Sequence, residues 1–556
     1  MPSAPRMSKR LSQAPRMSII MAGDDPQERK RELSLREICA DHVKTIATLL
    51  MIFGTIACIV VIVLIHKWHF EESRVKEIEA CLDVAVIGAG ISGSYASWRM
   101  RHDAKAIIHL FELRSSAGGR LRTEHFPDYE NVKMKAELGA LYYFPQRHPL
   151  LNRTIHALRL TPEGYYTELF LPKSIHENPL LVKYNRYINL YEMGYWNFLN
   201  NVASREGFNF IQDGTPWRSH VSNGNAALLA TLDLNTWDYH ATLAEGMQEL
   251  PKTMARQFAN SSHRKKRWLH GVYYELVFQQ TETVDGTIYN ITKSERFCAN
   301  EVILAISPAA LKHIRFIGFD DNTPSLWSLV DAVLDPIPAT TAYLLFNESW
   351  WSGARPGYED VITDLPLRRT RYVASGRRKS RDGADVKQAE YGHLFLGASS
   401  DFQDVSYFDL FLRHGHGSVV HSECNITRQG LLDLKTQFAR LQGLKDANAL
   451  PDPIGFYAVD WRKPPTYAGW HLWKRGVRWD REAAHLLKPL ANDAIYLIGS
   501  DICPGSCQLW AEGALRTVES LLESYFPKYY AMPLDGASVA DDQLAVGDEV
   551  KMPLFN

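Results

Sequence analysis

One long apolar run interrupts the otherwise mixed pattern of hydrophobic and polar residues. It covers residues 45–65 (TIATLLMIFGTIACIVVIVLI) and contains no charged residue. An α-helix rises 1.5 Å per residue, so a helix of this length just spans a hydrocarbon core of about 30 Å. The run therefore predicts one transmembrane helix. The alternative is a cleaved signal peptide, but its apolar core would be shorter and would begin closer to the N-terminus.

Basic residues on the two sides of this run predict its orientation. Positive charge favours the cytosolic side, which places the N-terminus in the cytosol and the large C-terminal part in a lumen or outside the cell. Five Asn-x-Ser/Thr acceptors also lie on that C-terminal side and predict a glycoprotein. The basic residues are Arg29, Lys30, Arg31, Arg36 and Lys44 before the run and Lys67, Arg74 and Lys76 after it; the acceptors are Asn152, Asn260, Asn290, Asn347 and Asn425.

Beyond the apolar run, shorter periodic segments predict strands and helices. Residues 82–87 (LDVAVI) are rich in β-branched side chains and predict a strand, which leads into the helical pattern SYASWRM. Residues 106–112 (AIIHLFE) predict a second strand. Alternating residues around Asp285-Gly286 predict a hairpin whose second strand returns to the sheet. The charged residues 1–44 and the acidic residues 531–556 predict disordered tails.

Composition narrows the class of protein. A chain of 556 residues with 46% hydrophobic and 22% charged residues can bury sizeable cores, and its net charge of -1 gives no reason to expect nucleic acid as a partner. No metal-binding motif is evident. Seven cysteines are too few for a disulfide scaffold in a chain of this length. Cys503 and Cys507 are close enough to pair in an oxidising compartment, or they are two free thiols.

The first strand is followed by a dinucleotide-binding pattern. Gly88, Gly90 and Gly93 have the G-x-G-x-x-G spacing between the predicted strand and helix. The first glycine permits a tight turn, the second lets the backbone approach a pyrophosphate, and the third allows the helix to pack on the strand. Glu112 ends the second strand, where an acidic side chain meets a ribose hydroxyl. The glycines and this carboxylate together predict a bound dinucleotide.

Further motifs resemble those of the flavin-containing amine oxidases, a superfamily that includes monoamine, polyamine and L-amino-acid oxidases. The segments ELRSSAGGRLR, AELGALYY, EGMQELP and the closing AIYLIGSDICPGSCQLWAEGAL occur in the order of that family and cover nearly all of the chain after the apolar run. The resemblance implies FAD as cofactor. It implies cofactor-binding roles for Gly88, Gly90, Gly93, Glu112, Gly119, Arg120, Gly139, Ala140, Gly499, Asp501 and Ala511, with Asp501 on the ribityl chain.

The positions of these motifs predict the fold. The expected class is α/β, with a Rossmann-like FAD-binding domain and an inserted α+β substrate domain, preceded by one transmembrane helix. The FAD-binding domain is expected to be discontinuous, over residues 82–150, 240–315 and 455–526. Residues 151–239 and 316–454 are assigned to the substrate domain.

Aromatic residues are the main candidates for the substrate side of the site. Oxidation of an amine by flavin requires an oriented and desolvated substrate rather than an acid–base dyad. Trp510 falls where the family places one aromatic wall, and either Trp470 or Trp473 supplies the other. His471 either orients or deprotonates a substrate amine, or it is a hydrogen-bonded core residue. The segment TYAGWHLW lacks the cysteine to which monoamine oxidases attach flavin, so noncovalent FAD is expected.

Two departures from the family pattern concern the substrate and the electron acceptor. L-amino-acid oxidases commonly have Met-Arg where this chain has Leu141 and Tyr142, and a phenol cannot replace the arginine that binds a substrate carboxylate. Arg147 is the nearest alternative. Thr341 stands where the family places a lysine that contacts the flavin through water. Tyr142 remains a candidate residue of the substrate site.

The sequence thus predicts a membrane-anchored FAD-dependent oxidoreductase that oxidises a C–N bond of an amine or an amino-acid-derived substrate. Oxygen is the expected acceptor, giving hydrogen peroxide, although another acceptor is open. A desaturase or thioether-cleaving flavoenzyme on the same scaffold is the enzymatic alternative. A non-catalytic binding protein with a flavin-type fold is the alternative from another class.

Overall fold

The structure is a computed structural model. It describes residues 44, 50–55, 61, 81–103, 105–126, 135–166, 180, 182–214, 224–231, 239–261, 273–284, 287–318, 325–346, 350–351, 360–375, 391–399, 405–407, 419–421, 427–532 and 534. The chain divides into two units, Met1–Glu77 and Ile78–Asn556.

In the first unit, residues 50–55 are helical and exposed. Most of the predicted transmembrane segment, residues 45–65, lies outside the described residues, as do nearly all of the predicted tails, residues 1–44 and 531–556. Within the described part of the chain, no helix combines the length and the apolar character that crossing a membrane requires.

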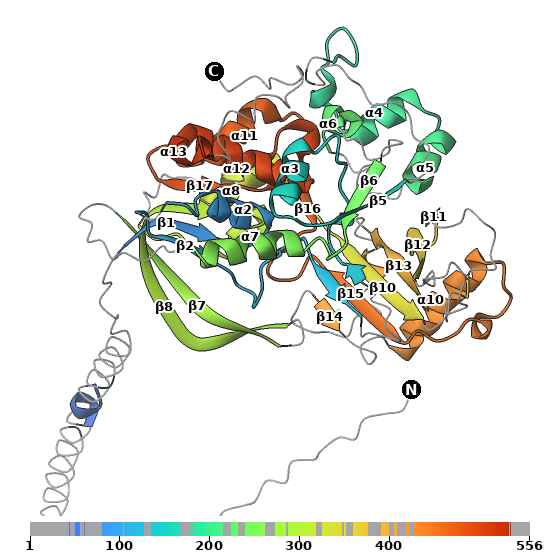
Figure 1. The fold of residues 1–556 in the computed structure, drawn as a ribbon, viewed down its shortest axis with the longest axis horizontal. Coiled ribbons are helices and arrows are strands. Elements are labelled where there is room, and N and C mark those ends of the chain that lie inside the picture. Colours follow the sequence, from blue (N-terminus) through green and yellow to red (C-terminus); the bar gives the residue numbers. More distant parts are fainter. Residues whose placement is uncertain are drawn as a thin grey trace, which may run out of the picture. The chain divides into compact units, whose positions relative to one another are not determined.

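A mostly parallel sheet forms the core of one part of the second unit (Figure 1). Its central strand, β1, is buried on both faces because its side chains alternate between two cores. Val84 and Val86 pack with α2, α7 and α12, whereas Ala85 packs with α8 and α11 on the other face. The parallel strands are, in order, β17 (Ile495–Leu497), β8 (Thr287–Leu304), β1 (Leu82–Ile87) and β2 (Ile108–Phe111); the helices are α2 (Ile91–Arg99), α7 (Glu249–Ala259), α8 (Leu326–Val333), α11 (Trp479–Leu487) and α12 (Ala511–Tyr525).

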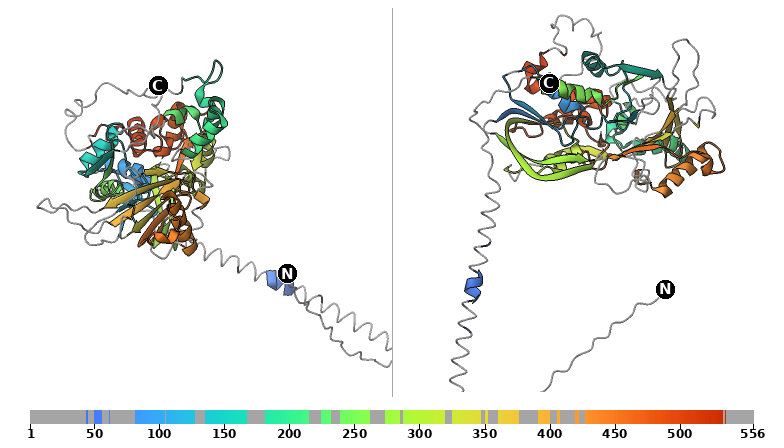
Figure 2. Two further views of the ribbon diagram at one scale, coloured as in Figure 1. Left: turned by 90° about the vertical axis from the view of Figure 1, so that its right-hand side faces the viewer. Right: turned by 60° about the horizontal axis from the view of Figure 1, so that its bottom comes forward.

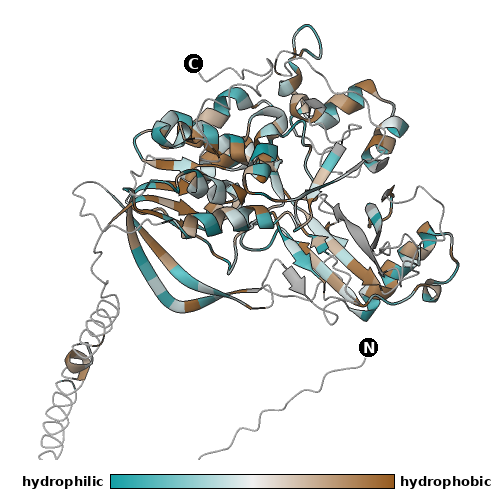
Figure 3. Ribbon diagram, viewed as in Figure 1, coloured by the Kyte–Doolittle hydropathy of each residue, from teal (hydrophilic) through white to brown (hydrophobic). Residues whose placement is uncertain are grey.

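The predicted hairpin around residues 285–286 is confirmed. β7 (Tyr274–Val284) pairs antiparallel with β8, with Val284 opposite Thr287. The hairpin extends away from the sheet, and hydrophilic residues occupy much of its length (Figures 1–3). The last residues of β8 return to the sheet between β1 and β17, as expected from the sequence.

A disulfide joins the beginning of β1 to β8. Cys81 bonds to Cys298, and the next residues, Leu82 and Ala299, are partners in the parallel ladder. The sequence pattern had not predicted this pair, because 217 residues separate the two cysteines and only the sheet brings them together.

A six-stranded antiparallel sheet lies in the other part of the second unit. Helix α10 (Arg428–Leu441) packs on one face, where Leu434 and Phe438 meet Leu344. The opposite face packs on Phe126 and Leu138. The strand order is β11 (Asp360–Ile362), β12 (Arg369–Ser375), β13 (Tyr391–Ser399), β10 (Thr340–Phe346), β15 (Gly455–Asp460) and β14 (Val419–His421).

The parallel sheet draws its strands from all three segments assigned to FAD binding. One boundary differs from the predicted division, because Gly455–Asp460 forms β15 of the six-stranded sheet. Thr340–Leu345 pairs with it along its whole length, so the backbone hydrogen bonds of this strand are satisfied there. The α/β class with a Rossmann-like parallel sheet and a second α+β part is confirmed.

The other elements connect or flank the two sheets. β3 (Thr123–His125) pairs with β4 (Lys135–Glu137), β5 (Pro162–Tyr166) with β6 (Tyr239–Leu243), and β9 (Leu334–Ile337) with β16 (Trp470–Trp473). The remaining helices are α3 (Pro149–Ala157), α4 (Tyr195–Val202), α5 (Arg205–Gly214), α6 (Ala226–Thr231) and α13 (Pro527–Tyr530), with 3₁₀ turns η2 (Leu190–Glu192), η4 (Pro308–His313), η5 (Ala447–Ala449), η6 (Ser500–Ile502) and η7 (Gly505–Cys507).

Candidate functional site

The glycine-rich turn after β1 leaves no room for a side chain at Gly88 or Gly93. Gly88 has φ +102°, and a Cβ there would lie 2.6 Å from the carbonyl oxygen of Ala305. A Cβ on Gly93 would lie 1.9 Å from the carbonyl oxygen of Gly88, so only glycine lets α2 begin this close to the turn. Gly90 caps α2 without a side-chain hydrogen bond. The N-terminus of α2 thus has no side-chain cap, and such a helix end favours a bound anion.

Glu112 follows the end of β2, beside this turn. Its Oε2 accepts a hydrogen bond from the backbone N–H of Ala89 at 2.6 Å, and its Oε1 accepts one from the N–H of Arg114 at 3.0 Å. Burial raises the pKa of Glu112 despite these two hydrogen bonds, which favour the ionised form. A carboxylate offers about four acceptor positions, so both oxygens keep capacity for ribose hydroxyls.

The second glycine motif interlocks with the first. Gly119 has φ +61°, and a Cβ there would lie 3.1 Å from the Cα of Gly90. A Cβ on Gly139 would lie 1.7 Å from the carbonyl oxygen of Arg120, which accepts a hydrogen bond from the N–H of Ala140 at 3.1 Å. Both segments thus form one tightly packed wall of the site.

Asp501 is the centre of a buried ionic network. Its carboxylate forms a bidentate ion pair with Arg120, in which Nη1 lies 2.9 Å from Oδ1. The N–H of His471 donates to Oδ1 at 3.0 Å, and Nδ1 of the same residue lies 3.2 Å from that oxygen. Burial alone would raise the pKa of Asp501, but the Arg120 charge and these hydrogen bonds hold it well below its usual range. Burial would lower the pKa of Arg120, but the Asp501 carboxylate raises it.

One cavity of about 850 Å³ joins these elements. Its volume is in the range of small-molecule and cofactor sites. The predicted residues that line it are Gly88, Gly90, Glu112, Gly119, Arg120, Gly139, Ala140, Tyr142, Trp470, Gly499, Trp510 and Ala511. Four predicted residues do not line it: Gly93, His471, Trp473 and Asp501.

His471, Trp473 and Asp501 are buried behind the cavity wall. Trp470 and Trp473 are on β16, where side chains alternate between two faces. Trp470 borders the cavity, whereas Trp473 is fully buried and its indole N–H donates to the carbonyl of Cys503 at 3.1 Å. His471, 1% exposed, holds Asp501. The Asp501 carboxylate binds Arg120 and His471. Its contact with the ribityl chain stays a prediction.

Further aromatic side chains, which do not line the cavity, pack behind Trp510 and Tyr142. Trp510 lies next to Tyr142, with ring centroids 6.0 Å apart, and also contacts Phe144 at 5.1 Å and His148 at 4.9 Å. His240 packs on Tyr142 at 4.5 Å. Burial, followed by the nearby arginine charges, lowers the pKa of His148 to about 3, so this imidazole is neutral at physiological pH.

Sequence reasoning missed His148 and His240 because no motif marks them. They lie on α3's N-terminal side and on β6, and only packing around Trp510 brings them together. Both departures from the family pattern lie at the cavity, because Leu141, Tyr142 and Thr341 line it. Arg147, the alternative to the missing arginine, does not line it, and its guanidinium lies 5.8 Å from the ring centroid of Phe144.

The residues present fit an adenine dinucleotide. The glycine cradle would admit a pyrophosphate at the start of α2, and Glu112 would accept the ribose hydroxyls. Among the described lining residues the other end is aromatic, with Trp461, Trp470 and Trp510. Such a cavity can bind a long cofactor at one end and desolvate a small substrate at the other.

A family model and two relatives match this chain. Residues 86–158 match the family model of an NAD(P)-binding Rossmann-like domain. Aplysianin-A of Aplysia kurodai is 26% identical over 534 residues, covering 82% of this chain and 92% of that protein. Achacin of Lissachatina fulica is 24% identical, covering 80% and 93%.

Solved structures of two oxidases share the fold. A putrescine oxidase bound to putrescine has a TM-score of 0.52 at 16% identity, covering 79% of this chain and 97% of that one. Cyclohexylamine oxidase from Brevibacterium oxydans has a TM-score of 0.53 at 16% identity, covering 80% and 99%. The predicted resemblance to amine oxidases is confirmed at the level of the fold.

Proposed function

We propose that this chain, which resembles the flavin-containing amine oxidases in its motifs and its fold, oxidises the C–N bond of a small amine. The observation that carries this proposal is the single cavity that joins Glu112 and the glycine turn to Trp470 and Trp510. FAD bound there would accept hydride from the carbon next to the substrate nitrogen. Oxygen as acceptor, with hydrogen peroxide as product, belongs to the same proposal.

The chain's own residues would bind and orient both molecules. Glu112 and the N-terminus of α2 would hold the nucleotide end. The Arg120–Asp501 pair keeps the wall between the two ends in place. Trp470 and Trp510 would exclude water and align the substrate carbon. No cysteine is among the described residues that line the cavity, which supports noncovalent FAD.

Charge in the cavity favours an amine without a carboxylate. Of the lysines and arginines that the structure describes, only Arg120 lines the cavity. Its guanidinium is bonded to Asp501 and to the carbonyl of Gly469 at 3.0 Å, so it is not positioned for a substrate anion. A carboxylate buried against the aromatic wall would lose its hydration without gaining an opposite charge.

Matched substrate pairs test the proposal. Purified full-length protein loaded with FAD is mixed anaerobically with phenethylamine or L-phenylalanine, with cadaverine or L-lysine, and with a thioether, and flavin bleaching is followed. We expect an amine to bleach the flavin faster than the amino acid that differs from it by the carboxylate. A yellow protein that no amine bleaches would contradict amine oxidation. Bleaching by the thioether alone would establish the other enzymatic class, and protein that binds no FAD would support a non-catalytic role.

We also propose that residues 45–65 anchor the protein in a membrane, with the N-terminus cytosolic and the catalytic part lumenal or extracellular. The Cys81–Cys298 and Cys503–Cys507 disulfides support an oxidising compartment. Asn260 and Asn290 are exposed, as a glycosylation acceptor must be. Glycosidase digestion should increase the mobility of the wild type, and less so for Asn260→Gln/Asn290→Gln. Unchanged mobility of both proteins would contradict this orientation.

A further inference from the structure

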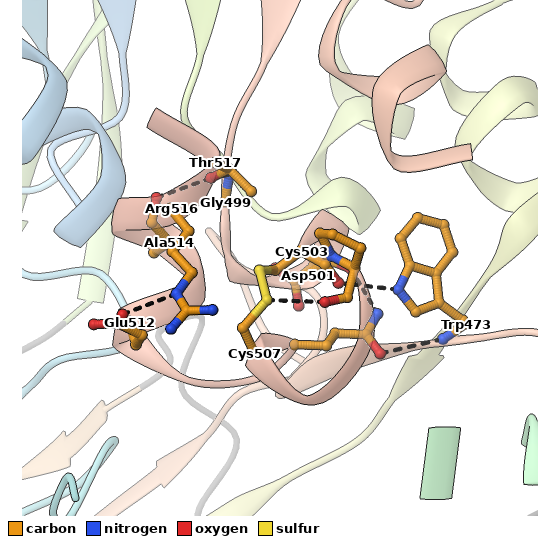
Figure 4. The surroundings of a disulfide bond; sticks show 11 residues. Trp473, Gly499, Asp501, Cys503, Cys507, Glu512, Ala514, Arg516 and Thr517 are labelled. Carbon is orange, nitrogen blue, oxygen red and sulfur yellow. Dashed lines mark hydrogen bonds and ion pairs between the residues drawn. A yellow bond between two sulfur atoms is a disulfide. The ribbon is translucent and has the colours of Figure 1, made fainter. Parts of the chain in front are cut away.

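The CPGSC loop, residues 503–507, connects two parts of the cavity wall. Before it lie Gly499 and Ser500, and after it lie Leu509 and Trp510, all of which line the cavity. The disulfide between Cys503 and Cys507 closes this loop on itself (Figure 4). The two wall segments are therefore joined by a short covalent ring as well as by the backbone.

The loop is packed so closely that small movements would be transmitted. Cys503 is fully buried and Cys507 is 7% exposed. A Cβ on Gly513, in the first turn of α12, would lie 2.0 Å from the carbonyl oxygen of Cys507. On the other side, Trp473 donates to the carbonyl of Cys503 (Figure 4). The backbone carbonyl groups of the loop thus contact α12 on one side and the Trp473 side chain of β16 on the other.

Leu509 shows that this region constrains the backbone. It has φ +79°, a left-handed conformation that costs free energy in any residue with a Cβ. Such a conformation persists only where the surroundings enforce it. Gln508, which is fully buried, enforces part of it by donating from Nε2 to the carbonyl of Asp501 at 2.7 Å. The turn at Leu509 sets the direction in which the next residue, Trp510, enters the cavity.

We propose that the Cys503–Cys507 disulfide is a positioning element that holds Leu509 in its left-handed conformation and so places Trp510 in the cavity wall. This inference rests on the proposed function for its kinetic consequence. It does not rest on that function for the placement of Trp510, which is read from the bound flavin. The disulfide acts through Trp510 and contacts no reacting atom.

The test compares the full-length FAD-loaded protein with Cys503→Ser/Cys507→Ser. The control is Cys81→Ser/Cys298→Ser. It removes a disulfide at the end of β1 that lies opposite the cavity. We expect the first variant to change the visible circular dichroism of bound FAD and to slow anaerobic flavin reduction about tenfold to a hundredfold. The control should lower stability and leave the flavin spectrum as in the wild type. A wild-type flavin spectrum and reduction rate in Cys503→Ser/Cys507→Ser would overturn the proposal.

Trp510→Ala completes a double-mutant cycle with Cys503→Ser/Cys507→Ser. If the disulfide acts through Trp510, adding Cys503→Ser/Cys507→Ser to Trp510→Ala should change the flavin spectrum and rate little further. Additive effects would contradict the proposal. If Cys503→Ser/Cys507→Ser does not fold, it is combined with Leu509→Gly, because glycine adopts the positive φ without strain. This combination should restore folding and a flavin spectrum close to that of the wild type, and failure to restore them would contradict the proposal. Should no amine reduce the flavin of the wild type, the proposed function fails, while the spectra still decide the role of the disulfide.

Discussion

Asp501→Asn tests whether the buried ion pair with Arg120 holds the cavity wall. The substitution keeps the shape of the side chain and an acceptor for the N–H of His471, but it removes the negative charge. Arg120 then stays largely buried without a counter-charge, and breaking such a pair costs about 3–5 kcal/mol. The Arg120 side chain is 25% exposed, whereas Asp501 is 1% exposed. Because water can partly solvate the arginine, we expect the lower end, about 3 kcal/mol.

Urea unfolding of the full-length protein, followed by tryptophan fluorescence, measures this loss. With a slope of about 3 kcal/mol per molar urea, the midpoint should fall by about 1 M. The control is Asp480→Asn, which removes an ion pair with Arg478 whose side chains are 37% and 34% exposed. Solvent screening limits that pair to less than about 1 kcal/mol.

The effect should also depend on pH with a defined sign. The folded pKa of Asp501 is depressed, so its contribution to stability is complete above the usual carboxyl pKa of about 4 and disappears as the pH falls through the folded value. The difference between wild type and Asp501→Asn should therefore be full at pH 7 and shrink only in strong acid. A loss at pH 7 no larger than that of Asp480→Asn would refute the reasoning.

Four further substitutions test other parts of the site. Gly93→Ala should abolish FAD binding, measured by fluorescence titration, because its Cβ would lie 1.9 Å from a carbonyl oxygen of the nucleotide turn. Burial raises the pKa of Glu137 to about 7, so the free energy of unfolding of the wild type should fall as the pH rises from about 4.5 to 7. Glu137→Gln should remove about 3 kcal/mol of that pH dependence, measured by urea titrations. Trp473→Phe should lower the free energy of unfolding by about 1–2 kcal/mol through its lost hydrogen bond. Trp470→Phe should instead change the KM for an amine.

Local patterns were sufficient for the nucleotide-binding half of the site. The spacing of Gly88, Gly90 and Gly93 acts within one turn. Gly88 and Gly93 are required because a Cβ at either position would collide with a nearby carbonyl oxygen. Glu112 is placed by the end of its own strand. Because these constraints arise from short-range sterics and backbone geometry, a single sequence contains them.

The substrate half depended on packing between distant segments. The sequence left Trp470 and Trp473 as alternatives, and only the pairing of β16 with β9 decided which of them borders the cavity. His148 and His240 are recruited around Trp510 from two other elements, without any motif. The same holds for Asp501, whose carboxylate is taken up by Arg120 and His471 behind the wall.

The amino-acid sequence by itself thus determined the chemistry of the cofactor cradle, the hairpin and the likeness to flavin amine oxidases. The tertiary structure decided which aromatic side chains meet, which cysteines are paired and which polar groups lie behind the cavity wall. The physical reason is the sequence separation over which the interactions act. Turn and strand geometry are set by neighbouring residues, whereas burial and side-chain contacts depend on where the two sheets bring remote segments together.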